Sequence, residues 1–199
     1  HRLNLHASYG NFGGKFVDRD QIRPEHFQSW VDWARDQNIG IDFNSTLFSH
    51  PKAEKSFTLS SKERSIREFW IEHVNRCREI GAFIGKELET PCIHNIWIPD
   101  GAKDLTVDRF VHRKLLKESL DNILSKKFDP KTIRDAVESK LFGIGMEAYT
   151  VGSHEFYLAY AVKNDIILCL DIGHFHPTEQ VSDKVSAVFQ FIDGLLFHF

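Results

Sequence analysis

Six short apolar runs alternate with longer segments of helical periodicity, and this alternation limits the fold more than any other feature of the sequence. The runs lie at Leu3–His6, Ile39–Asn44, Cys92–Ile98, Ala136–Ile144, Ile166–Leu170 and Leu195–Phe199. Between them, apolar residues recur at the three- and four-residue spacing of an amphipathic helix. Strands that alternate with helices build parallel βαβ units. The sequence therefore predicts an α/β fold with a parallel sheet, and neither a repeat nor a break in composition divides residues 1–199 into two domains.

Local signals mark where helices begin. Pro24 suits the first turn of a helix, because its φ angle is already helical and its missing N–H is not needed there. Ser60 and Glu63 have the spacing of a capping box, which predicts that the next helix begins at Ser60. Ser153 precedes an aromatic segment that predicts a short helix through Tyr160.

The composition excludes several classes of protein. The hydrophobic fraction is 42% and the net charge is −3, from 25 Lys+Arg against 28 Asp+Glu, which is unlike a disordered chain or a nucleic-acid binder. No apolar run approaches the roughly 18 residues that span a bilayer. The three cysteines are far apart and odd in number, which indicates a reducing cytoplasm rather than a disulfide scaffold. The polar, Gly-rich first 20 residues do not resemble a signal peptide.

Polar side chains gather where the predicted strands end. They are His6, Asp42, Asn44, Asn95, Trp97, Glu138, Lys140, Asp171, His174 and His198. In parallel α/β folds the functional residues lie at the carboxyl ends of the strands. A doubly wound sheet brings only a few strand ends to one site, whereas a closed barrel points all of them at one centre. The pattern therefore favours a barrel.

Two short motifs have both a functional and a structural interpretation. Glu138 and Lys140 are two residues apart, so on a strand they face the same side, which would be the barrel interior. They form either a buried salt bridge or part of a site. Asp171 and His174 follow an apolar run directly. They either ligate a cation, or cap a turn and bond to the backbone.

Taken together, Glu138, Asp171 and His198 indicate a metal site. They come from three successive predicted strands and combine two carboxylates with one imidazole, a set that suits Mn²⁺, Mg²⁺, Co²⁺ or Zn²⁺. The set lacks a thiolate, which excludes a structural zinc site of the cysteine type. Trp97 is expected to face inward, where an aromatic wall suits the C–H face of a sugar, although plain core packing is the alternative. The sequence has neither a Gly-rich phosphate loop nor a Gly-x-Ser-x-Gly motif.

The chain resembles the L-rhamnose isomerase family from residue 2 to Phe199. The resemblance is carried by RLNLHA, QIRPEHF, DFN followed by FSHP, NIWIPDG, VESKLFGIG and LCLDIGHFHPTE. It implies a cytoplasmic (β/α)₈ TIM barrel, usually a homotetramer, that interconverts L-rhamnose and L-rhamnulose with two divalent metals, commonly Mn²⁺ and otherwise Zn²⁺ or Co²⁺. The sugar is the expected partner, without nucleic acid or membrane.

The resemblance also implies roles for single residues. Glu138, Asp171 and His198 match the ligands of the metal that grips the sugar hydroxyls, and His174 matches a ligand of the second metal. The residues that match sugar contacts are His6, Trp97 and Lys140, with His6 helping ring opening and Lys140 stabilising charge on the sugar oxygen O1.

The sequence departs from the family pattern by truncation. It matches strands two to seven of the eight, so it is expected to form an incomplete barrel that is inactive alone. The family's Trp-Asp-x-Asp segment, which supplies two further carboxylates, is absent after His198. Two other functions stay open: another metal-dependent sugar isomerase or epimerase of the xylose-isomerase type, or an inactive fragment that binds at most one metal.

Overall fold

The computed structural model describes residues 1–55, 57–104, 108–140 and 148–199. Six parallel strands form the main sheet in the order β1-β2-β3-β5-β7-β8. Their bounds are Arg2–His6 (β1), Gly40–Asn44 (β2), Cys92–Ile96 (β3), Ile133–Glu138 (β5), Ile167–Asp171 (β7) and Leu195–His198 (β8). Two short strands, β4 (Gly101–Ala102) and β6 (Tyr149–Thr150), form a separate antiparallel pair. The predicted parallel α/β sheet is confirmed.

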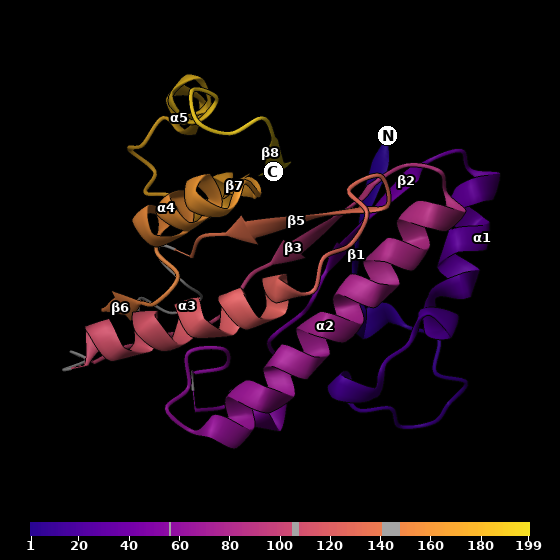
Figure 1. The fold of residues 1–199 in the computed structure, drawn as a ribbon, viewed down its shortest axis with the longest axis horizontal. Helices are drawn as coiled ribbons and strands as arrows, with labels where there is room; N and C mark the ends of the chain where they lie inside the picture. The colour runs from indigo at the N-terminus through magenta and orange to yellow at the C-terminus, as the bar shows by residue number, and fades with distance from the viewer. Residues whose placement is uncertain (56, 105–107, 141–147) are drawn as a thin grey trace.

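Helices flank the strands of this sheet (Figure 1). They are α1 (Gln28–Asp36), α2 (Arg64–Glu87), α3 (Arg109–Ser125), α4 (His154–Asn164) and α5 (Val181–Val188). Short 3₁₀ helices span Ala7–Tyr9, Arg19–Gln21, Pro24–Phe27, Pro51–Ala53 and Ile172–His174. Among the described residues, no helix is long and apolar enough to cross a membrane.

Side chains alternate between the two faces of each strand, and this alternation separates the core from the polar interior. Leu5, Phe43, Val137 and Leu168 face the helices, where they are fully or almost fully buried. The alternate positions point to the other face, and Glu138 is one of them. The apolar positions therefore attach the helices, while the polar ones remain available for a site.

The sheet is curled into a half-barrel. β1 and β8 are its two outermost strands, yet Nδ2 of Asn4 on β1 lies 3.3 Å from Nε2 of His198 on β8. A flat sheet of six strands would hold these side chains far apart, because neighbouring strands are about 4.8 Å from one another. The chain ends accordingly lie near each other in Figure 1. The interior side chains of all six strands therefore face a common centre.

Two local predictions were wrong. The capping box at Ser60 does not form: α2 begins at Arg64, and its N-cap residue Glu63 makes no capping hydrogen bond with its side chain. Ser60 instead donates from its backbone N–H and its hydroxyl to the buried carboxylate of Asp100, at 3.0 and 2.6 Å. The fourth run was expected to be a strand over Ala136–Ile144, but the strand covers Ile133–Glu138, and residues 141–147 lie outside the described residues.

Candidate functional site

Glu138, Asp171 and His198 meet at the carboxyl ends of β5, β7 and β8. The register pairs Glu138 with Cys169 and Asp171 with His198 across neighbouring strands. Nδ1 of His198 lies 3.3 Å from Oε2 of Glu138 and 3.9 Å from Oδ2 of Asp171. The structure thus brings together the three residues that the sequence assigned to one metal.

His174 joins this cluster from the turn that follows β7. Asp171 stabilises the turn by accepting the N–H of Gly173 through Oδ1 at 2.7 Å, so the predicted capping role is real. Its other oxygen, Oδ2, faces Nδ1 of His174 at 3.7 Å. Asp171 therefore uses one oxygen for the turn and turns the other toward the cluster, and its role as a cation ligand stays a prediction.

Glu138 is the centre of the cluster and is only 3% exposed. Its Oε1 lies 3.0 Å from Nδ1 of His174, its Oε2 faces His198, and it also accepts a hydrogen bond from Asn95. Burial opposes ionisation of Glu138, but its close contacts with the imidazoles of His174 and His198 outweigh burial and lower its pKa to about 2. Among the described residues, Glu138 forms ion pairs with these two imidazoles. The buried salt bridge between Glu138 and Lys140, which was the structural interpretation of this motif, is not among those pairs.

The histidines respond in the opposite direction. The hydrogen bond to Glu138 raises the pKa of His198. Burial lowers the pKa of His174, but its contact with Glu138 and the nearby charge of Asp171 outweigh burial, so the net pKa is raised. The cluster therefore attracts positive charge, which protons or a metal cation can supply.

Two sets of side chains have the geometry and the chemistry to hold a metal. Glu138, Asp171 and His174 form one set, and Glu138, Cys169 and His198 form the other, with the ligand atoms of each set within 4.8 Å of one another. Nδ1 of His174 is buried and, despite its short distance to Glu138, has no hydrogen-bond partner of acceptable angle among the described residues. A buried nitrogen of this kind beside two carboxylates fits a divalent cation.

Cys169 is a member that sequence reasoning missed. It lies two residues before Asp171 on β7, so strand periodicity places both on the same face. The predicted set contained no thiolate, whereas the structure places the Cys169 thiol beside Glu138 and His198. Burial raises the pKa of the Cys169 thiol, which keeps it neutral in the absence of a cation.

Aromatic rings line one side of the cluster. Trp97 stacks on His174 with ring centroids 5.9 Å apart, and Nζ of Lys140 lies 5.9 Å from the centroid of Trp97. Lys140 also donates to the carbonyl of Pro99 at 2.8 Å. Phe48, which the sequence did not single out, meets Trp97 edge-on at 5.6 Å. These rings form a wall beside the carboxylates.

Of the other polar residues at strand ends, His6 lies near the cluster, whereas Asp42 and Asn44 are used in other contacts. His6, at the end of β1, lies near His198, and burial together with the charge of His198 lowers its pKa. Asp42 does not join the cluster, because Arg2 holds it at 2.8–3.0 Å and the N–H of Ile93 donates to it at 2.8 Å. Asn44 is used locally, where its Oδ1 accepts the N–H of Thr46.

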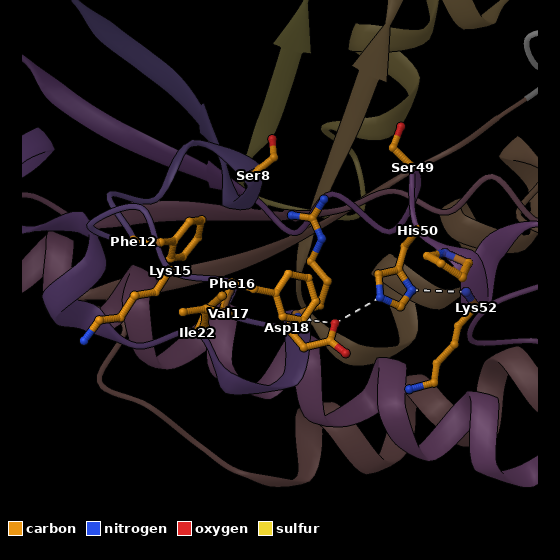
Figure 2. A pocket seen from close by; sticks show the side chains of 12 residues that line it. Ser8, Phe12, Lys15, Phe16, Val17, Asp18, Ile22, Ser49, His50 and Lys52 are labelled. Atoms are coloured by element: carbon orange, nitrogen blue, oxygen red, sulfur yellow. Dashed lines mark hydrogen bonds and ion pairs between the residues drawn. The ribbon is translucent and has the colours of Figure 1, made fainter.

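A cavity of about 610 Å³ lies between the loops that follow β1 and β2 (Figure 2). Asp18 and His50 face each other at its edge, with 2.9 Å between Oδ1 and Nε2. None of the cluster residues lines this cavity. It is therefore separate from the carboxylate–imidazole cluster.

Comparison with known proteins decides the family. The family model described as L-rhamnose isomerase (RhaA) matches residues 1–199. The chain belongs to the L-rhamnose isomerase family. The L-rhamnose isomerase of Rhodopirellula baltica is 54% identical over 100% of this chain and 46% of its own length, and that of Mannheimia succiniciproducens is 57% identical over 99% and 47%. The chain thus spans about half the length of these curated L-rhamnose isomerases.

Solved structures agree with the family on the fold. A D-psicose 3-epimerase from Clostridium cellulolyticum superimposes with a TM-score of 0.63 at 14% identity, over 98% of this chain and 62% of that one. A 3-keto-D-glucoside 4-epimerase from E. coli superimposes with a TM-score of 0.51 at 12% identity, over 98% and 77%. At such low identity these likenesses show the fold alone. The predicted incomplete TIM barrel and the resemblance to L-rhamnose isomerase are confirmed, while the roles of single residues stay predictions.

Proposed function

We propose that this chain is one partial (β/α)₈ domain over residues 1–199 that carries much of the active site of an L-rhamnose isomerase. The supporting observation is the cluster in which buried Glu138 lies between His174 and His198, with Asp171 beside both. In a chain of this family, such a set of carboxylates and imidazoles favours a metal-dependent isomerase. The curated relatives are about twice as long as this chain, and the remaining part of each relative would complete its own barrel.

The reaction is the interconversion of the aldose L-rhamnose and the ketose L-rhamnulose. Glu138, Asp171 and His198 would hold one divalent metal and His174 would contribute to a second, with Mn²⁺ expected and Zn²⁺ or Co²⁺ as alternatives. When bound, such metals supply Lewis acidity at the two sugar oxygens O1 and O2. The hydride passes from C2 to C1 of the open-chain sugar, O2 loses its proton as C2 becomes a carbonyl, and O1 gains a proton as C1 becomes an alcohol. No redox cofactor is required, since one carbon is oxidised as its neighbour is reduced.

Three further side chains have roles in this proposal. His6 accepts the proton of the O1 hydroxyl as the bond from C1 to the ring oxygen breaks and the ring oxygen gains a proton, and its lowered pKa supports this role because a neutral imidazole is a base. Lys140 places a positive charge near O1 as negative charge develops there. Trp97 presents an aromatic face to the C–H face of the sugar, and its position against His174 supports this role.

The resemblance supports a cytoplasmic homotetramer as the working state. The three cysteines are all buried and free, which fits a reducing compartment. Size-exclusion chromatography with light scattering tests the oligomeric state of the full-length enzyme.

Deuterium at C2 of L-rhamnose tests the reaction directly. A hydride shift keeps the label in L-rhamnulose, whereas an enediol route exchanges it with solvent, and mass spectrometry of the product separates the two outcomes. The measurement requires the full-length enzyme, because the described strands do not complete the barrel. Complete loss of the label to water would overturn the hydride shift and leave the isomerase activity intact.

The alternative is another sugar isomerase or epimerase. Two proteins named as sugar epimerases share this fold, so this class is the alternative to test. A panel of L-rhamnose, L-mannose, L-lyxose and D-allose tests the alternative, because a pocket discriminates a single methyl group by only about 1–3 kcal/mol. We expect the highest kcat/KM with L-rhamnose. A higher value with another sugar would replace the proposed substrate.

A further inference from the structure

We propose that Thr46 is a positioning residue that fixes the tautomer of His6, so that Nδ1 carries the proton and Nε2 is left free to accept one from the sugar. The inference rests on the proposed isomerase function for its consequence in catalysis, but the tautomer itself can be measured independently. It follows from three features of the structure: a hydrogen bond, an uncommon backbone conformation, and a buried network that supports it.

The hydrogen bond joins the ends of two neighbouring strands. Nδ1 of His6 lies 3.1 Å from Oγ1 of Thr46. The Thr46 hydroxyl has only one proton, and it donates that proton to the carbonyl of Asn44 at 3.3 Å. Its oxygen can therefore only accept from His6, which assigns the proton of the imidazole to Nδ1. Among the described residues, no side chain bonds to Nε2 of His6, so this nitrogen is available to a ligand.

The backbone at Thr46 is in the left-handed region, with φ of 53°. A β-branched residue rarely adopts this conformation, and such residues cluster at functional sites. The N–H of Thr46 donates to Oδ1 of Asn44 at 3.0 Å, and Thr46 is 2% exposed. The conformation directs the hydroxyl toward His6, and a glycine or asparagine, which adopt this φ more readily, could not supply a hydroxyl in the same place.

A buried network holds the preceding residue in position. Oγ of Ser45 lies 2.7 Å from Nε2 of His94, and Nδ1 of His94 lies 2.9 Å from Oδ1 of Asp135. Asp135 is paired in turn with Arg78 on α2 at 2.9–3.2 Å. His73, also on α2, bonds to the carbonyl of Ser45. The network connects α2, β5 and β3 to the end of β2, so the uncommon backbone conformation next to Ser45 is fixed from the helix side of the sheet.

Neighbouring rings limit the orientation of the His6 side chain. Tyr9 and Phe48 contact it edge-on, with ring centroids 6.3 and 6.1 Å away. The rings restrict the plane of the imidazole, but the hydrogen bond at its Nδ1 is made with Thr46 and with neither ring. The hydrogen bond to Thr46 is therefore what stabilises one tautomer of His6 over the other.

The test compares Thr46→Val with Thr46→Ser in the full-length enzyme. Valine keeps the shape of the side chain but removes the hydroxyl, whereas serine keeps the hydroxyl. Thr90→Val is the matched control, since the Thr90 hydroxyl bonds to Arg2 rather than to a site residue. ¹⁵N NMR of histidine-labelled enzyme reports the tautomer, with the His6 signals assigned by their absence in His6→Gln.

In the unaltered enzyme and in Thr46→Ser we expect His6 protonated on Nδ1, and the serine variant should retain kcat within about twofold. In Thr46→Val the His6 signals should shift toward the other tautomer, and kcat should fall roughly tenfold or more with metal content unchanged, as for the loss of general acid–base assistance. A proton on Nε2 of His6 in the unaltered enzyme overturns the inference, and so does full activity of Thr46→Val. An enzyme without isomerase activity but with the expected tautomer would instead refute the proposed function alone.

Discussion

The two carboxylate oxygens of Glu138 face two different imidazoles. The shorter distance is to His174, whose Nδ1 lies 3.0 Å from Oε1 of Glu138. The other oxygen faces His198 at 3.3 Å. One carboxylate is thus placed between two histidines that the proposed function assigns to different metals. A carboxylate in this position can bridge two cations or orient the ligands of both. The properties of the whole cluster therefore depend on this single side chain.

Glu138→Gln should lose metal and activity together. The amide keeps the size of the side chain but removes the charge that holds two imidazoles and, in the proposed function, a divalent cation. Metal content measured by mass spectrometry on the full-length enzyme should fall by about tenfold or more, and kcat with it. Asp135→Asn is not a suitable control because it also removes a buried charge, so the exposed Glu87→Gln serves instead. Normal metal content with normal turnover in Glu138→Gln would refute the ligand assignment.

Lys140→Met should separate metal binding from turnover. Methionine keeps the aliphatic stem beside Trp97 and removes the ammonium group, which lies 5.9 Å from that ring. Because the Lys140 ammonium group is proposed to stabilise negative charge that develops on the sugar, we expect kcat to fall by roughly 10²–10³ while metal content is unchanged. The measurement pairs steady-state kinetics with metal analysis. Loss of metal in this variant would count against a role at the substrate.

The sequence predicted the fold and the cluster through simple periodicities. Alternating strand and helix signals locate the parallel sheet, and the polar positions within or directly after the apolar runs locate Glu138, Asp171 and His198. Such predictions succeed because a parallel sheet requires its functional side chains at one end.

Other features depend on contacts between distant segments and left no sequence pattern. Asp42 is chemically indistinguishable from a metal ligand in the sequence, but Arg2 on the neighbouring strand neutralises it. Ser60 matches a capping box, yet the buried Asp100, forty residues away, takes its hydrogen bonds. In both residues a long-range partner overrides the local signal, and only the tertiary structure supplies that partner.

Arg78→Met should destabilise the protein strongly. The guanidinium forms hydrogen bonds at 2.9–3.2 Å with Asp135 and also bonds to the carbonyl of Ile123, and the side chains of both Arg78 and Asp135 are at most 10% exposed. Removing it leaves a buried carboxylate without its ion-pair partner, which costs about 3–5 kcal/mol. Denaturant unfolding of the full-length protein measures the change.

The exposed pair of Arg35 and Glu87, at 3.1 Å, supplies the matched control for this prediction. Solvent screens that pair, so Arg35→Met should change the free energy of unfolding by only about 0–1 kcal/mol. Equal effects of the two substitutions would show that the buried pair contributes no more than a surface one.

Stability should fall as the pH decreases from 6.5 toward 4, because His73 is buried in its neutral form. Burial lowers the pKa of His73 from 6.5 to about 4, although the carbonyls of Arg19 and Ser45, one beside each ring nitrogen, act in the opposite direction. The neutral imidazole has one N–H and donates to one of these carbonyls at a time. Between these two pH values the unfolded chain binds a proton that the folded chain does not, so the free energy of unfolding rises with pH across this window. The full difference corresponds to roughly 3 kcal/mol.

In His73→Gln, the unfolding free energy measured at pH 4.5 and at pH 7 should differ less than in the unaltered protein, whatever the overall cost of the substitution. The exposed His176→Gln is the matched control for the substitution itself. An unchanged pH dependence in His73→Gln would show that the folded protein protonates this imidazole as readily as the unfolded chain does.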